Sequence, residues 1–169
     1  VDVEMLCGAD AAAAEILAAL PKGTPARPVI PAAAPAPAGA LGLRDVATVL
    51  RAEVGDTPVS FASLARGWPV DLWPHRDPLD YLGKDGGGGV GSGPGLTIGA
   101  ALALRGSGRF CVGVLGDGDT LMGINALWTA AKYRIPALFI VGNNRSYFND
   151  ELHQERVAER RGRNPANAW

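Results

Sequence analysis

A chain of 169 residues is long enough for one globular domain with an appendage. Its composition, 47% hydrophobic and 20% charged, is typical of a folded protein and not of a disordered one. The net charge of −1 argues against a basic binding face, so we expect neither nucleic acid nor a membrane surface as a partner.

The beginning of the chain differs in pattern from the rest. Residues 1–7 alternate or run apolar like a strand, and residues 11–20 predict a helix capped by Asp10. Because one strand and one helix bury no core, we interpret residues 1–23 as the C-terminal remnant of a middle domain. Residues 24–40 are rich in Pro and Ala and predict an extended linker.

Residues 41–169 alternate helical and strand patterns and predict the main domain, which we expect to be truncated at its C-terminus. Its strands are apolar throughout, which is typical of a parallel sheet buried on both faces. We therefore predict an α/β fold, a mostly parallel sheet with helices on both faces, in which ligands bind at the carboxyl ends of strands. The expected elements are helices over 43–53, 96–104, 121–133 and 151–161 (the last capped by Asp150), strands over 59–64, 110–115 and 137–141, and a glycine run over 86–95.

The cysteines and the apolar runs indicate a compartment. Cys7 and Cys111 are far apart and make no disulfide framework, and Cys111 lies in an apolar run typical of a core. No apolar stretch reaches the roughly 20 residues of a membrane helix, and no signal peptide opens the chain. We therefore expect a cytoplasmic protein.

The segment Gly116-Asp117-Gly118-Asp119 lies between the expected strand 110–115 and the helix that follows it. Glycines there let the backbone approach a ligand, and the amino end of a helix favours phosphate. The carboxylate of Asp117 and a phosphate can share this place only if a cation lies between them. Mg²⁺ commonly joins a carboxylate to phosphates in this way, so the segment indicates a metal–phosphate site.

A second polar pair, Asn143-Asn144, follows the next apolar strand. The intervening residues 119–142 number 24, enough for a helix and the return strand of a right-handed crossover. If the two strands are neighbours, Asp117 and Asn144 lie at adjacent strand ends, and their oxygens can reach one ion.

Other interpretations of these residues are open or excluded. Asp-Gly is most often only a turn, and Asn-Asn only a loop or a cap. An EF-hand beginning at Asp117 fails, because its sixth position is Met122 and its twelfth is Trp128. The run Gly86-x-Gly88-x-x-Gly91 fits a dinucleotide-binding pattern, but no strand precedes it.

The motif Gly116-Asp117-Gly118, 24 residues, Asn143-Asn144 resembles the signature of thiamine-diphosphate enzymes, in the branch of acetolactate synthase and benzoylformate decarboxylase. The resemblance covers residues 41–169 and implies the C-terminal diphosphate-binding domain of that family. It implies that Mg²⁺ is bound by the side chains of Asp117 and Asn144 and by the backbone carbonyl of Ser146. It further implies that the backbone N–H groups of Gly118 and Asp119, beside Gly116, contact the diphosphate.

The glycine run resembles the family segment that holds the aminopyrimidine ring of the cofactor. There the carbonyl of Gly88 would accept a hydrogen bond from the cofactor, and Val90 would be the apolar wedge that bends it. The family's activating glutamate belongs to a separate pyrimidine-binding domain that no part of this chain resembles. We therefore expect no catalytic residue in this chain and no turnover by this segment alone.

The resemblance implies thiamine-diphosphate-dependent cleavage or ligation of carbon–carbon bonds in 2-oxo acids. Acetolactate-synthase-like ligation is the leading expectation; simple decarboxylation, or a non-catalytic module for cofactor binding or assembly, is the alternative. It also implies a homodimer or homotetramer. Tyr147 and Phe148 are candidates for the substrate pocket, whereas we assign Trp128 and Tyr133 to packing and His153 to a solvated helix face.

Overall fold

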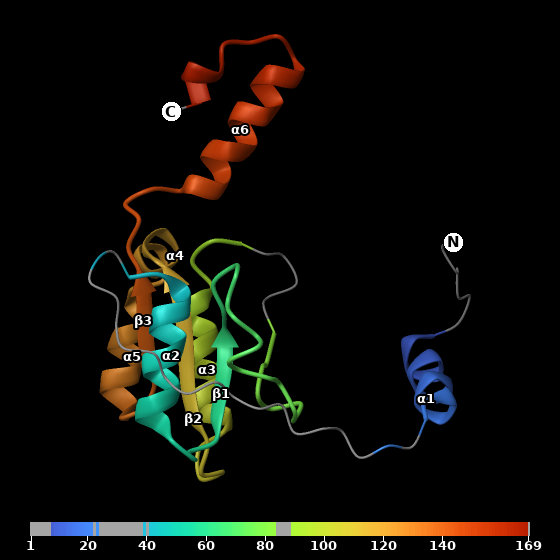
Figure 1. Cartoon of the computed structure of the whole chain (residues 1–169). Coiled ribbons are helices and arrows are strands. Elements are labelled where there is room, and N and C mark those ends of the chain that lie inside the picture. Colours follow the sequence, from blue (N-terminus) through green and yellow to red (C-terminus); the bar gives the residue numbers. More distant parts are fainter. Residues whose placement is uncertain (1–7, 22, 24–38, 40, 84–88, 169) are drawn as a thin grey trace.

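The computed structural model describes residues 8–21, 23, 39, 41–83 and 89–168. The expected strand over residues 1–7, most of the linker and Gly88 lie outside these ranges. Figure 1 shows a sheet between helices, and one helix near each end of the chain lies apart from it. In chain order the elements are α1 (Ala9–Ala19), α2 (Leu43–Val54), β1 (Val59–Ser63), α3 (Gly93–Ala103), β2 (Phe110–Gly116), α4 (Asp117–Met122), α5 (Asn125–Tyr133), β3 (Leu138–Gly142), α6 (Phe148–Arg160) and the 3-10 helix η1 (Pro165–Ala168).

The described sheet has three strands in the order β1-β2-β3, and both neighbouring pairs are parallel. This confirms the predicted α/β fold with a parallel sheet. The pairing of β2 with β3 runs without interruption from Val112 opposite Leu138 to Gly116 opposite Gly142. The two strands therefore end side by side, as the sequence required for a shared site.

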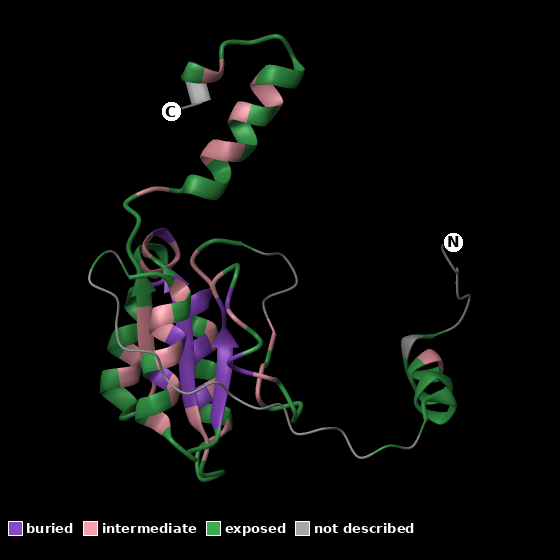
Figure 2. Ribbon diagram, viewed as in Figure 1, coloured by how far each residue is buried: buried purple, intermediate pink, exposed green. Residues whose placement is uncertain are grey.

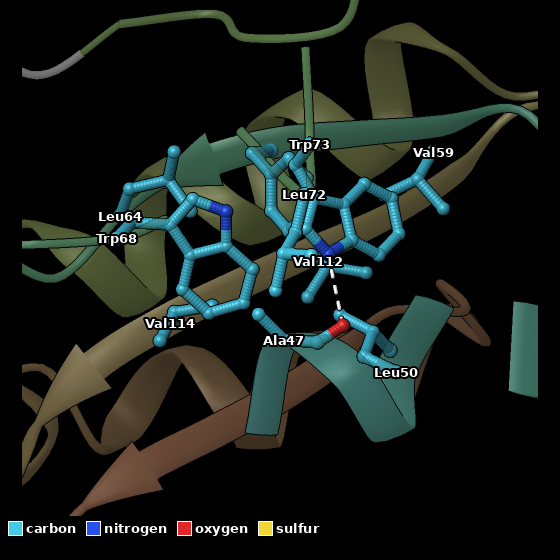
Figure 3. Close-up of a cluster of buried hydrophobic side chains, with 10 residues drawn as sticks. Ala47, Leu50, Val59, Leu64, Trp68, Leu72, Trp73, Val112 and Val114 are labelled. Carbon is cyan, nitrogen blue, oxygen red and sulfur yellow. Dashed lines mark hydrogen bonds between the residues drawn. The ribbon is translucent and has the colours of Figure 1, made fainter. Parts of the chain in front are cut away.

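One face of the sheet packs against α2 and the segment that follows β1 (Figure 3). The ring of Phe61 contacts those of Trp68 and Trp73, at centroid distances of 5.3 and 5.0 Å. The indole N–H of Trp73 donates to the backbone carbonyl of Ala47 at 3.0 Å, which ties α2 to this cluster. Trp68, Leu72 and Trp73, in the segment that follows β1, thus belong to the hydrophobic core.

The opposite face packs against α3 and α5 around Ala62, Ile98 and Cys111. Burial raises the pKa of the Cys111 thiol to about 11, as expected for a core cysteine. Helix α3 lies so close to β2 that a Cβ on Gly113 would overlap the hydroxyl of Thr97. That hydroxyl donates to the carbonyl of Gly93 at 2.8 Å and has no room to move away.

Several helix boundaries differ from the expected ones. The single helix predicted over 121–133 is two helices, α4 and α5, and Asp117 begins α4 instead of preceding it. The break comes at Gly123, where a Cβ would overlap the carbonyl of Gly91 and contact the ring of Pro94. Helix α3 begins at Gly93, three residues before the expected start, with Pro94 in its first turn.

The two predicted capping residues do not cap. Asp10 lies in the first turn of α1, whose N-cap is Gly8. Asp150 lies in the first turn of α6, where its N–H and that of Glu151 donate to the carbonyl of Tyr147. Backbone groups therefore begin both helices, and the carboxylates act there only through the helix dipole.

The burial of the chain falls off toward β3 and α6 (Figure 2). Trp128 and Tyr133, assigned to packing from the sequence, are 65% and 61% exposed, so that assignment was wrong. Helix α6 projects beyond the carboxyl edge of the sheet and leaves His153 exposed as expected. Among the described helices, none is long and apolar enough to cross a membrane.

A polar clamp closes the amino end of β1. The guanidinium of Arg109 donates to the hydroxyl of Ser60 at 2.7 Å and to the carbonyl of Val59 at 3.0 Å, and it forms an ion pair with Asp80. Asp80 also accepts backbone N–H groups from Arg76 and Asp77. Partial burial opposes ionisation of Asp80, but these hydrogen bonds outweigh it and lower the pKa of the carboxyl.

We expect Gly113→Ala to destabilise the fold by about 1–3 kcal/mol, because the new methyl group has to push α3 away from the sheet. Gly99→Ala on the same helix, where a Cβ meets nothing within 4 Å, is expected to stabilise by roughly 0.5–1 kcal/mol. Urea unfolding of both variants checks this. Equal stability of the two variants would contradict the close approach of α3 to β2.

The clamp also predicts a pH dependence of stability. Because the folded-state pKa of Asp80 lies below its ordinary value of 3.8, its contribution is complete above about pH 4 and is lost as the pH falls through the folded-state pKa. Thermal unfolding between pH 5 and 2 should show a steeper loss for the wild type than for Asp80→Asn. If the two proteins lost stability equally over this pH range, the ionised form of Asp80 would not be stabilised in the folded state.

Candidate functional site

The predicted site residues lie where β2 and β3 end. Asp117 follows Gly116, the last residue of β2, and Asn143-Asn144 follow Gly142, the residue paired with Gly116. Adjacent strands and an unshifted register thus bring the two motifs to one edge of the sheet. Asp117 and Asn144 are 27 residues apart in sequence and still follow strand ends at the same edge of the sheet.

The Asp117 carboxylate is held toward the turn after β3. Its Oδ2 accepts the backbone N–H of Arg145 at 2.8 Å, and its Oδ1 accepts the N–H of Gly118 at 3.0 Å. Each carboxylate oxygen keeps a free lone pair, because two hydrogen bonds use only part of the acceptor capacity of the group. The carboxylate is therefore fixed in direction and still able to bind a cation.

The turn over residues 143–146 is built by its own asparagines. Oδ1 of Asn143 accepts the N–H of Arg145 at 3.1 Å, and Oδ1 of Asn144 accepts the N–H of Ser146 at 3.2 Å. Arg145 has a φ of 58°, a left-handed conformation that is uncommon for a residue other than glycine. Such backbone strain is characteristic of functional turns, where neighbouring interactions hold it in place.

A groove runs along this edge of the sheet. It has a volume of about 960 Å³, and both Asp117 and Asn144 line it. A second pocket of about 530 Å³ is lined by Asp117, Gly118 and residues of the 143–147 turn. Apart from Gly88, which lies outside the described residues, every predicted cofactor-binding residue lines the groove: Val90, Gly116, Asp117, Gly118, Asp119, Asn144 and Ser146.

Tyr147 and Phe148, the candidates for a substrate pocket, also line this groove, and about half of each side chain is exposed. The ring of Tyr147 lies directly against Gly118, where a Cβ would overlap it. Gly118 therefore has to lack a side chain if Tyr147 is to keep its place over the start of α4. The hydroxyl of Ser146 is buried without a hydrogen-bond partner among the described residues.

The side chain of Asp119 has a role that the sequence did not predict. Its Oδ1 accepts the backbone N–H of Gly91 at 2.6 Å and that of Gly93 at 3.3 Å. Sequence reasoning considered only the backbone N–H of Asp119. A carboxylate in a short helix and a distant glycine-rich helix start are each common, and nothing in the sequence pairs them.

The donor set fits a hard cation that is shared with a phosphate. Among the described residues, no group of three His, Cys, Asp or Glu side chains is placed to hold a metal by itself. One carboxylate and neutral oxygens suit Mg²⁺, which keeps phosphate and water ligands besides the protein's. The unpartnered Ser146 hydroxyl also leaves polar capacity in the groove for a ligand.

Comparison with known proteins agrees with this geometry. The family model described as "Thiamine pyrophosphate enzyme, C-terminal TPP binding domain" matches residues 53–168. Benzoylformate decarboxylase of Pseudomonas aeruginosa is 43% identical over 72 residues, which are 43% of this chain and 13% of that protein. The solved structure of a thiamine diphosphate-dependent 4-hydroxybenzoylformate decarboxylase of Rhodococcus jostii RHA1 superposes with a TM-score of 0.59 and 28% identity, covering 86% of this chain and 28% of the other.

The chain thus spans less than a third of either relative's length. The family match nevertheless covers well over half of the chain, and the solved relative has the same arrangement of strands and helices. With the motif, the register and the groove in agreement, the chain belongs to the thiamine pyrophosphate enzyme family, as its C-terminal TPP-binding domain.

Proposed function

We propose that this chain forms the Mg²⁺–diphosphate half of a thiamine diphosphate site in an enzyme that decarboxylates 2-oxo acids. The observation that carries the proposal is the shared groove, into which two adjacent strand ends bring Asp117 and the 143–146 turn. The family match supports the cofactor, and the names of both relatives support the reaction.

In this proposal the side chains of Asp117 and Asn144 and the carbonyl of Ser146 are the protein's ligands to Mg²⁺. The N–H of Arg145 keeps the Asp117 carboxylate in place, and the ion offsets the repulsion between that carboxylate and the diphosphate. The N–H groups of Gly118 and Asp119 at the start of α4 are donors to the diphosphate. Gly118 has to give up the hydrogen bond to its neighbour's Oδ1 to do so.

Farther along the groove we assign Val90 to the cofactor's aminopyrimidine end, together with the carbonyl of Gly88. Val90 lines the groove and is 46% exposed, so an apolar surface is available to a ligand there. When bound, thiamine diphosphate supplies an electron sink for the bond next to the substrate carbonyl. The activating glutamate is expected from a pyrimidine-binding domain, so this chain holds and orients the cofactor.

The substrate proposed is a 2-oxo acid with an aromatic or bulky apolar group. Both relatives are named for benzoylformate or its 4-hydroxy derivative. Apolar and aromatic side chains line the groove beside the polar ones, among them Val90, Ile140, Tyr147, Phe148 and Leu152. The acetolactate-synthase-like ligation expected from the sequence stays a prediction, and decarboxylation now has the better support.

We also propose assembly of two or four copies, as the family resemblance implies. Large apolar side chains on α4 and α5 are exposed, including Leu121 at 69%, Met122 at 63% and Trp128 at 65%. A concentration of large exposed apolar side chains on two neighbouring helices favours an interface.

Replacement of Asp117 tests the metal assignment. In the intact protein, Asp117→Ala should weaken Mg²⁺-dependent binding of thiamine diphosphate by more than the roughly 10- to 100-fold typical of residues that only support a ligand. Isothermal titration calorimetry measures this, and Asp56→Ala is the control, because it removes an exposed carboxylate near the amino end of β1. Unchanged binding by Asp117→Ala would reject the proposed ion site.

The substrate proposal predicts which 2-oxo acid the intact protein turns over. We expect release of CO₂ from benzoylformate with a kcat/KM at least about tenfold above that for pyruvate, because an apolar group gains burial in the groove. A coupled assay of the aldehyde product measures the first reaction, and a colorimetric assay for acetolactate measures the competing one. Acetolactate as the main product from pyruvate would restore the ligation prediction.

A further inference from the structure

We propose that the side chain of Asp119 is a positioning residue that sets the width of the cofactor groove. The 89–93 segment, which contains Val90, forms one wall of the groove, and the start of α4 with the proposed metal-binding turn 143–146 forms the other. Asp119 would hold these two walls at a fixed distance from each other. This inference rests on the proposed function, since it concerns a ligand that touches both walls. It concerns the carboxylate of Asp119 and not the backbone N–H already assigned to the diphosphate.

The contacts of Asp119 join the two walls directly. Its backbone lies in the first turn of α4, two residues after Asp117. Its carboxylate accepts the N–H groups of Gly91 and Gly93, on either side of the start of α3. The residue just before Gly91 is Val90, which lines the same groove as Asp117 and Asn144.

The helix dipole explains why a carboxylate is suited to this place. Ser92, the N-cap residue of α3, makes no side-chain capping hydrogen bond, so the amino end of α3 lacks a local cap. Asp119 supplies an acceptor and a negative charge from another helix, which the partial positive charge of the helix end favours. The N–H groups of Gly91 and Gly93 hold the carboxylate against the glycine segment.

The local packing leaves the contact little freedom. A Cβ on Gly93 would overlap Oδ2 of Asp119, and one on Gly123 would overlap the carbonyl of Gly91. A Cβ on Gly91 would lie 2.9 Å from Cβ of Met122. Three glycines thus allow α4 and the 89–93 segment to touch through their backbones, and Asp119 fixes the direction of that contact.

A ligand that spans both walls should depend on Asp119, whereas one confined to the metal end should not. Thiamine diphosphate is the first kind and Mg²⁺-pyrophosphate is the second. We therefore expect Asp119→Ala to weaken thiamine diphosphate binding by about tenfold or more, the effect of losing charge-assisted hydrogen bonds. Pyrophosphate affinity should stay within about threefold, or rise, because a negative charge near the diphosphate is removed.

Isothermal titration calorimetry of the intact protein in excess Mg²⁺ measures both affinities, and thermal unfolding verifies that each variant is folded. Asp119→Asn keeps an acceptor oxygen and should recover part of the loss. Gly123→Ala shifts the Gly91 carbonyl without changing any charge, so it should show the same selective loss. Gly95→Ala, where a Cβ meets nothing within 4 Å, should change neither affinity.

The outcomes separate this inference from the proposed function. If the wild type bound neither ligand, the cofactor site itself would be wrong and the inference with it. If the wild type bound both, and Asp119→Ala and Gly123→Ala lost both ligands equally or lost neither, the metal site would stand and the positioning role would be overturned. A purely structural role lowers the unfolding midpoint but leaves the ratio of the two affinities unchanged.

Discussion

The parallel pairing of β2 with β3 is the constraint on which the candidate site depends. A slip of one residue in that register would turn every side chain of β3 to the opposite face and move the 143–146 turn along the edge of the sheet. In the observed register Gly116 pairs with Gly142, which leaves Asp117 next to the turn. One hydrogen bond, from the N–H of Arg145 to the Asp117 carboxylate, then joins the two segments.

The second wall of the groove depends on close backbone packing. Helix α3 approaches β2 through Gly113, and α4 approaches the 89–93 segment through Gly91 and Gly123. These glycines have no side chain to hold them, and the Asp119 carboxylate joins α4 to the 89–93 segment by accepting the N–H groups of Gly91 and Gly93. The hydrophobic effect brings the layers together, and these directed hydrogen bonds fix the contact between α4 and the 89–93 segment.

The sequence predicted the fold class and the edge of the sheet at which polar residues gather. These follow from apolar runs and from the spacing between Asp117 and Asn144, which are properties of short windows. Predictions that depended on distant partners failed. The break at Gly123 lies where the Gly91 carbonyl, 32 residues away in sequence, approaches closely, and Trp128 lies exposed on α5. The contact between Asp119 and Gly91 was missed for the same reason, because 28 residues separate the two groups.

The left-handed backbone of Arg145 couples the conformation of the turn to the binding of an ion. That conformation costs a residue with a side chain about 1–3 kcal/mol. The turn therefore depends on Asp117 and Asn143, which both accept the N–H of Arg145. A cation held as proposed, by Asp117, Asn144 and the carbonyl of Ser146, would compete with the Arg145 N–H for the Asp117 carboxylate. Ion binding and the population of this backbone conformation would then be thermodynamically linked.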